Sequence, residues 1–244
     1  MTATCHIGTL QLAGNDWVCP SAFVVLVLGL ISIAVFVANQ RLKEKGLVFE
    51  KLESTGFHVL ASPTEVQKLD AYAMINRELP NGLRAVSWIA RGEISNRTTF
   101  VIEHLAKIQR GRHTKWVYHT FAIASCPVKW PSVWVSGRNI GDELLGLVGI
   151  NRGDVATDSA QFNREWRVNS PDPDFANLIL SGAFLSAISR LPYETSVYLG
   201  RGKLVVGRKS RATSESIEEF AAMPAALLAL LPPELDAYQT PAGL

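Results

Sequence analysis

The chain has 244 residues, with 24 Lys and Arg against 22 Asp and Glu, so its formal net charge is +2. Proteins that bind nucleic acid by bulk electrostatic attraction carry a clear positive surplus, and this near-neutral balance argues against that class. The three cysteines, Cys5, Cys19 and Cys126, have no metal-ligand spacing, so the composition predicts no zinc site.

An uncharged run of 18 residues, Ser21 to Ala38, dominates the N-terminal part of the chain. As a helix it would be about 27 Å long, close to the ~30 Å hydrocarbon core of a bilayer. We therefore expect a single transmembrane helix over residues 21–39, with Pro20 at its start. A cleaved signal peptide and a buried core helix are the alternatives, and the absence of a basic n-region argues against the first.

The charges that flank this run predict its orientation. Residues 1–39 contain no Lys or Arg, whereas Arg41, Lys43 and Lys45 follow at once. The positive-inside rule therefore places residues 1–20 outside as a short tail, and the body in the cytoplasm at the inner membrane. Cys5 and Cys19 could pair on the outer side, which the sequence leaves open, while Cys126 is predicted to be a buried thiol.

The middle of the chain is rich in predicted strands. Residues 40–55 are expected to form a charged linker in which Gly46 could end or bend the helix. The elements predicted after it are a short strand over 56–60, a helix capped by Ser62 that ends near Leu79, strands Val86–Ile94, Thr98–Ile108 and Lys115–Ser125, a short strand Val133–Val135, and a short helix over 140–148. Residues 109–112 are predicted to close a hairpin.

The C-terminal part alternates helices and strands. The predicted elements are a strand Phe162–Asn169, a helix from the cap Asp172 to Leu191, a hairpin of Thr195–Leu199 with Lys203–Val206, and a helix from the cap Ser214 to Leu231. Residues 232–244 are expected to be a disordered tail. The fold class is therefore α+β: an N-terminal transmembrane helix followed by a mainly antiparallel sheet packed with helices, in one domain over 56–231.

Several segments together resemble a broad group of uncharacterised bacterial single-pass membrane proteins of unknown function. They are Lys45 to Glu50, Val101 to Leu105, Thr120-Phe121, Ser132 to Val135, Phe162 to Val168 and Ser196 to Val206, within residues 41–231. The resemblance implies a cytoplasmic α+β domain and no particular chemistry. Arg91-Gly92 and the tryptophans at 130 and 134 depart from the group's pattern.

Few residues suggest chemistry. A regular hairpin closed at 109–112 would pair residue 104 with 117, making His104 and His119 diagonal neighbours on one face, with Glu103 on the other. We interpret His104 and His119 as histidines of the core, in preference to half of a metal site. Arg201-Gly202-Lys203 lacks the strand-to-helix context of a phosphate-binding loop, and no serine hydrolase or zinc protease motif is present. The sequence therefore assigns no catalytic, cofactor-binding or metal-binding residue and no cofactor.

Basic residues gather in two predicted turns. One turn has Lys107, Arg110, Arg112 and Lys115, and the other has Arg201, Lys203, Arg208, Lys209 and Arg211. They could rest on anionic lipid headgroups, although turns are often charged because they are solvated. We expect a membrane-anchored, non-enzymatic binding or scaffolding domain that contacts lipid headgroups or a protein partner and no nucleic acid. The alternative is a hydrolase-like enzyme that acts on a membrane-associated substrate.

Overall fold

The structure is a computed structural model that describes residues 20–64, 67, 86–110, 113–126, 130–138 and 155–238. The chain forms two compact units, Met1–Glu44 and Lys45–Leu244. The N-terminal tail with Cys5 and Cys19, and the short helix predicted over 140–148, lie outside the described residues. Most of the helix predicted after Ser62 lies outside them too. At its start, Thr64 and Gln67 exchange side-chain to backbone hydrogen bonds, so the capping pair lies two residues later than predicted.

The described part of the first unit is the exposed part of helix α1 (Pro20–Ser54). The stretch Phe23–Ser54 is long and apolar enough to cross a membrane, with a mean hydropathy of 2.4 over its most apolar window, none of which is buried. Ser32 donates its hydroxyl to the carbonyl of Leu28 at 2.9 Å, so this polar group is satisfied inside the helix. Length and composition thus agree with the span expected from the sequence.

The last ten residues of α1 belong to the second unit. The helix continues through Gly46 and ends at Ser54, where the N–H groups of Gly56 and Phe57 bond the carbonyls of Glu53 and Leu52. Gly56 has a φ of +86°, the left-handed conformation that this helix ending requires and that glycine adopts without strain. Val48 and Leu52 are fully buried, so this end of α1 forms part of the domain core and does not serve as a linker.

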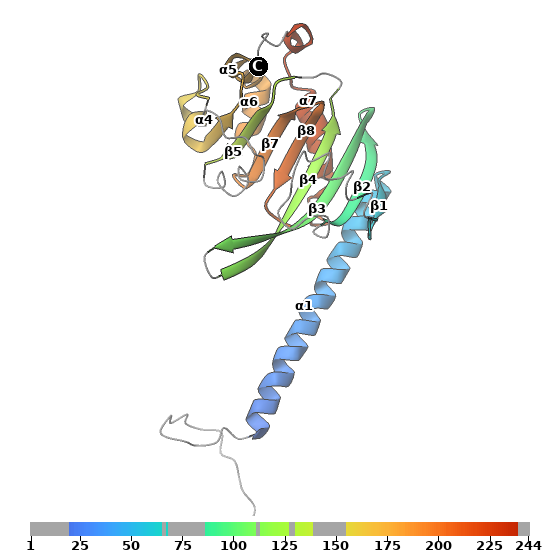
Figure 1. The fold of residues 1–244 in the computed structure, drawn as a ribbon. Helices are drawn as coiled ribbons and strands as arrows, with labels where there is room; N and C mark the ends of the chain where they lie inside the picture. Colours follow the sequence, from blue (N-terminus) through green and yellow to red (C-terminus); the bar gives the residue numbers. More distant parts are fainter. Residues whose placement is uncertain are drawn as a thin grey trace, which may run out of the picture. The chain divides into compact units, whose positions relative to one another are not determined.

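The second unit is built on one eight-stranded sheet in which every described strand pair is antiparallel. The strands are β1 (His58–Leu60), β2 (Val86–Ile94), β3 (Arg97–Arg110), β4 (His113–Ser125), β5 (Val133–Gly137), β6 (Trp166–Asn169), β7 (Thr195–Gly200) and β8 (Lys203–Arg208). Their order is β1-β2-β3-β4-β8-β7-β5-β6, so β4 lies beside β8, a strand almost 80 residues later (Figure 1). The structure confirms the predicted α+β class.

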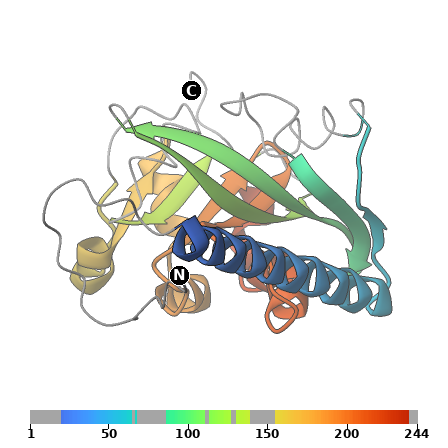
Figure 2. The same cartoon turned by 90° about the horizontal axis from the view of Figure 1, so that it is seen from below.

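Helices cover one face of this sheet, which we call the helical face (Figure 2). They are the end of α1 with α5 (Pro173–Ile179), α6 (Gly182–Ser189) and α7 (Ile217–Leu228). A row of small and β-branched side chains crosses the sheet beneath them at matched register: Val101, Ala122, Val206, Val197, Val135 and Val168. These residues are buried and form the main core with the apolar sides of the helices.

One predicted strand begins as a helix. Residues 162–165 belong to α4 (Ala160–Glu165), and only Trp166–Asn169 form a strand. The hydroxyl of Ser159 caps α4 by accepting the N–H of Phe162 at 3.2 Å. Phe162 and Trp166, four residues apart, then stack with ring centroids at 6.0 Å. The first four residues of the predicted strand Phe162–Asn169 are therefore helical, with Phe162 and Trp166 stacked four positions apart.

The other helices differ from expectation mainly at their ends. The helix predicted from Asp172 to Leu191 is interrupted between α5 and α6, where Gly182 has a φ of +51°. Asp172 caps α5 as predicted, because Oδ1 accepts the N–H of Phe175 at 3.0 Å. The final helix starts after Ser216, two residues later than the predicted cap, and it ends at Leu228.

The first part of the expected disordered tail is folded. Residues Pro233–Ala237 form a short 3-10 helix, η2, in which Leu235 is fully buried. The side chain of Trp130 donates to the carbonyl of Leu235, and Tyr238 packs against Phe175 with ring centroids at 4.9 Å. Apolar contacts therefore hold this segment on the core beyond the pair of prolines that ends the helical pattern.

Candidate functional site

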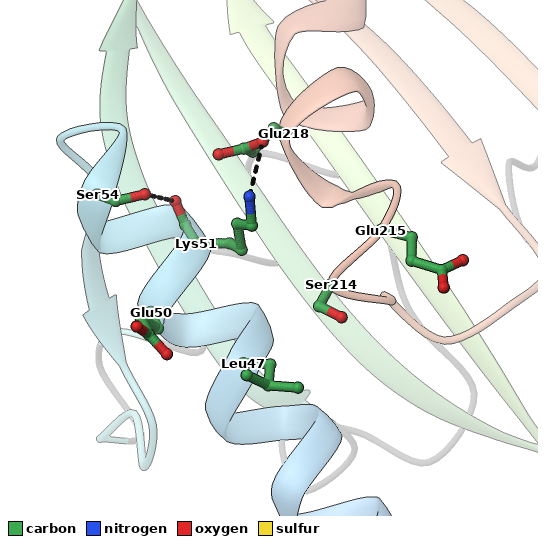
Figure 3. Close-up of a pocket in the computed structure, with 7 residues that line it drawn as sticks. All are labelled: Leu47, Glu50, Lys51, Ser54, Ser214, Glu215 and Glu218. Carbon is green, nitrogen blue, oxygen red and sulfur yellow. Dashed lines mark hydrogen bonds and ion pairs between the residues drawn. The ribbon is translucent and has the colours of Figure 1, made fainter.

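A surface hollow lies between the end of α1 and the start of α7. It has a volume of about 590 Å³, and we call it the α1–α7 groove (Figure 3). The residues that line it are Leu47, Glu50, Lys51, Ser54, Ser214, Glu215 and Glu218. Two elements far apart in the sequence thus form its two sides, which is why no sequence pattern indicated it.

The groove carries an excess of negative charge. Three glutamates and one lysine line it, and the lysine, Lys51, reaches across to Glu218 with Nζ 3.5 Å from the carboxylate oxygen (Figure 3). Both side chains are about half exposed, so this ion pair contributes no more than about 1 kcal/mol. Lys51 balances the charge of only one of the three glutamates, so Glu50 and Glu215 give the lining a net negative charge. The groove therefore suits cationic groups.

Local packing holds both sides of the groove in place. On α7, Ile217 and Ala221 are buried against Val48 and Leu52 of α1. The segment before α7 is closed by a 2.8 Å hydrogen bond between the hydroxyls of Thr213 and Ser216. Because these apolar residues point into the core, the charged residues of the same two helices are left at the surface, where they meet across the groove.

Glu103 lies on the helical face of the sheet, near the end of α1 and the segment before α7, and its side chain is almost fully buried. Burial raises the pKa of its carboxyl, while Arg211 and Lys45 and hydrogen bonds from the Ala212 N–H and the Trp88 side chain act in the opposite direction. The strand register places Glu103 opposite Trp88 on the helical face, away from His104, as the sequence predicted. A buried acid held by this many partners connects α1, β2 and the segment before α7.

Two arginines near this acid stack on aromatic rings. The guanidinium of Arg211 lies 3.9 Å from the ring centroid of Tyr118, and that of Arg208 lies 5.1 Å from that of Phe220. The Thr120 hydroxyl also donates to the carbonyl of Ser210 at 2.9 Å. These contacts fasten residues 208–212 to the sheet, so both arginines hold the fold together at this point.

His104 and His119 are direct cross-strand neighbours, whereas the sequence predicted a diagonal pair. His104 and His119 are directly opposite each other, with ring centroids 6.5 Å apart and nearly parallel planes, and both are buried. The expected diagonal arrangement was wrong because β3 pairs as far as Arg110, so that Arg110, in place of Ile108, is opposite His113 and the register shifts by two residues. Within the described part of the chain, no three His, Cys, Asp or Glu residues gather as metal ligands.

Cys126 is buried, and burial raises the pKa of its thiol to about 11. The thiol is therefore protonated at neutral pH and is a poor nucleophile, which agrees with the buried cysteine predicted from the sequence. Arg201 and Gly202 form the tight turn between β7 and β8, with φ values of 51° and 73°. The structure confirms the predicted hairpin, a context that lacks the helix that follows the lysine of a phosphate-binding loop.

The comparisons with known proteins show the fold and nothing finer. No protein-family model matches the chain, and no curated protein matches it. Among solved structures, the chain is similar to the crystal structure of the mycobacterial trehalose monomycolate transport factor A, TtfA. The TM-score is 0.51 at 13% identity, over 76% of this chain and 94% of that one. The neighbour is thus a bacterial protein, in agreement with the bacterial origin of the group that the sequence resembles.

Proposed function

We propose that this chain is a membrane-anchored, non-enzymatic binding module that holds a protein partner at the membrane surface. The observation that carries the proposal is the continuity of α1. One helix contains an apolar stretch long enough for a bilayer, and its last ten residues supply Val48 and Leu52 to the domain core. From Ala38 to Val48 a helix rises only about 15 Å, so an inserted span keeps the domain near the headgroups.

The α1–α7 groove is the place proposed for the partner. Its excess of carboxylates suits a segment that carries Lys or Arg, and Leu47, which is 48% exposed, offers an apolar contact beside them. The Ser54 hydroxyl donates to the carbonyl of Lys51, so it bonds within its own helix. The described lining residues are three glutamates, one lysine, two serines and one leucine, a composition that favours the binding of a cationic segment over the alternative of a hydrolase.

The fold likeness gives the role a general setting. TtfA is named as a transport factor for trehalose monomycolate. From this we propose only that the present chain is likewise an accessory protein of a membrane assembly. Its substrate or cargo is not part of the proposal, because the likeness shows the fold alone.

Site-specific photo-crosslinking in cells that express the full chain tests the proposal. A photoreactive phenylalanine analogue at Leu47 should form an adduct with a membrane protein that mass spectrometry identifies. Glu215→Lys should reduce the adduct, because it reverses a charge in the groove. The matched change Glu194→Lys alters an exposed glutamate that is not a lining residue, and it should leave the adduct unchanged.

Two results would overturn the proposal. One is an adduct of equal strength with Glu215→Lys and with Glu194→Lys, which would mean that the groove is not the contact surface. The other is recovery of the full chain in the soluble fraction after alkaline carbonate extraction, which would mean that α1 does not span a membrane. Ester hydrolysis by the purified full chain that Glu215→Lys abolishes would favour the enzyme instead.

A further inference from the structure

The long β3–β4 hairpin extends beyond the rest of the sheet. Pairing with β2 stops at His104, and pairing with β8 stops at Thr120. In the described sheet, residues 105–110 and 113–119 therefore pair only with each other, and they form a two-stranded projection that we call the β3–β4 ribbon (Figure 1). Six residues separate His104 from Arg110, so the ribbon is about 20 Å long.

The ribbon is basic and presents an aromatic ring to solvent. The residues of the ribbon include two lysines, Lys107 and Lys115, one arginine, Arg110, and no acidic residue. The register pairs Lys107 with Trp116 and Ile108 with Lys115. Trp116 is 55% exposed and the neighbouring Lys115 is exposed too. A large exposed indole beside several cations is typical of segments at a membrane–water interface.

The ribbon points toward the end of the domain from which α1 leaves. After the helix, Phe57 lies against Gly92; one turn before its end, Phe49 contacts the ring of Trp88 at 5.6 Å. Four residues earlier on α1, the charge of Lys45 lowers the pKa of Glu103, which pairs with Trp88 between β2 and β3. In the second unit, α1 therefore runs antiparallel to β3, and the N-terminal direction of α1 is the direction in which β3 enters the ribbon.

The second basic turn predicted from the sequence does not join this surface. Lys203 pairs with Ser125 at the opposite end of β4, twelve residues and about 40 Å from His113. Arg208 and Arg211 are stacked on Phe220 and Tyr118. The positive charge that the second unit carries near the exit of α1 therefore comes from the ribbon and from Lys45.

We propose that the β3–β4 ribbon is a second membrane contact, in which its cations bind anionic lipid headgroups and Trp116 inserts at headgroup depth. This rests on the proposed anchoring by α1. Each Lys or Arg near an anionic surface strengthens the contact about fivefold, so the three cations of the ribbon make a contact that one charge could not. Two attachments, the span and the ribbon, would restrict how the domain turns over the bilayer.

The test uses the full chain reconstituted in nanodiscs, with its native cysteines changed to serine and a bimane label on Thr114→Cys. A lipid carrying a quencher near its headgroup reports the distance of the label from the bilayer. Quenching should be strong in phosphatidylcholine mixed with phosphatidylglycerol, weak in phosphatidylcholine alone, and lost at high salt. Neutralising Lys115 with Gln should weaken the contact by about fivefold, and neutralising Lys107, Arg110 and Lys115 together should abolish it.

Matched variants keep the test decisive. Arg201→Gln with Lys203→Gln removes two charges from the far turn and should leave quenching unchanged. Trp116→Ser alters an exposed side chain and should reduce quenching without lowering the thermal midpoint. Equal quenching in both lipid compositions, or none in either, overturns the ribbon proposal. Quenching that appears only after a protein or RNA is added would overturn it too. Failure of the chain to co-elute with nanodiscs would instead overturn the anchoring.

Discussion

The phenol of Tyr238 donates a hydrogen bond of 2.6 Å to Oδ2 of Asp172, 66 residues earlier in the chain. The other oxygen of Asp172 caps α5 through the N–H of Phe175. One carboxylate therefore joins the C-terminal segment to the start of a core helix. Tyr238→Phe should lower the free energy of unfolding by about 1 to 2 kcal/mol, measured by denaturant titration of the full chain in detergent. An unchanged value would show that the contact contributes nothing.

The same pair predicts a pH dependence. Burial and the neighbouring Asp172 raise the pKa of Tyr238 to about 12, above the ordinary value of 10 for tyrosine. A raised pKa means that the folded state favours the protonated phenol, so this contribution is complete below pH 10 and is lost as the pH rises toward 12. The stability difference between the wild-type chain and Tyr238→Phe should therefore shrink over that range. A difference that stays constant to pH 12 would contradict the assignment.

Two leucines on α1 test whether the helix end belongs to the domain. Leu52 is completely buried, whereas Leu47 on the same helix is 48% exposed. Leu52→Ala should destabilise the domain by about 2 to 5 kcal/mol through lost burial and the cavity left behind. Leu47→Ala is the control and should change stability by less than about 0.5 kcal/mol. Equal effects would mean that the end of α1 is not part of the core. Tryptophan fluorescence during thermal unfolding would follow both variants.

The buried carboxyl of Glu103 predicts a second pH dependence of stability, at acidic pH. Because its pKa is raised in the folded state, its favourable contribution is complete below the ordinary pKa of 4.5 and falls as the pH rises through the raised value. Glu103→Gln should remove this fall and give a flatter stability profile just above pH 4.5. Glu93→Gln changes an exposed glutamate on β2 and should follow the wild type. A large loss of stability in Glu103→Gln at neutral pH would show that the charged contacts outweigh burial.

The proposed orientation can be tested with the native cysteines. In intact cells treated with a mild reductant, a membrane-impermeant maleimide should label Cys5 and Cys19 if the N-terminus is outside. Cys126 should stay unlabelled even after permeabilisation until the protein is denatured, because it is buried and its thiol has a pKa of about 11. Cys126→Ser separates the two signals. Labelling of Cys5 and Cys19 only after permeabilisation would reverse the orientation.

Local signals in the sequence determined a large part of the fold. The uncharged run at Ser21 to Ala38 predicted a helix of membrane-spanning length, and runs of strand-forming residues separated by short loops predicted β2, β3, β4 and the β7–β8 hairpin. Asp172 with the proline after it predicted the start of α5. These predictions succeeded because hydrogen bonds and side-chain faces within about ten residues decide them.

Tertiary contacts decided the rest. Residues 162–165 are helical although the sequence predicted a strand from Phe162, and the ring of Phe162 stacks on that of Trp166 four residues later. The tail at Leu235 and Tyr238 is held by the core, and the end of α1 is no linker because Val48 and Leu52 bury against α7. The candidate site also depends on tertiary contacts, because the α1–α7 groove brings residues 47–54 beside residues 214–218.

By itself, then, the sequence determined the apolar helix, the antiparallel strands and the class of the domain. Only the tertiary structure decided that β4 pairs with β8, that the β3–β4 ribbon extends past both neighbours, and that Glu103 is enclosed by α1 and the segment before α7. The physical reason is that strand order and burial depend on the free energy of contacts between distant segments, which no local period or spacing encodes.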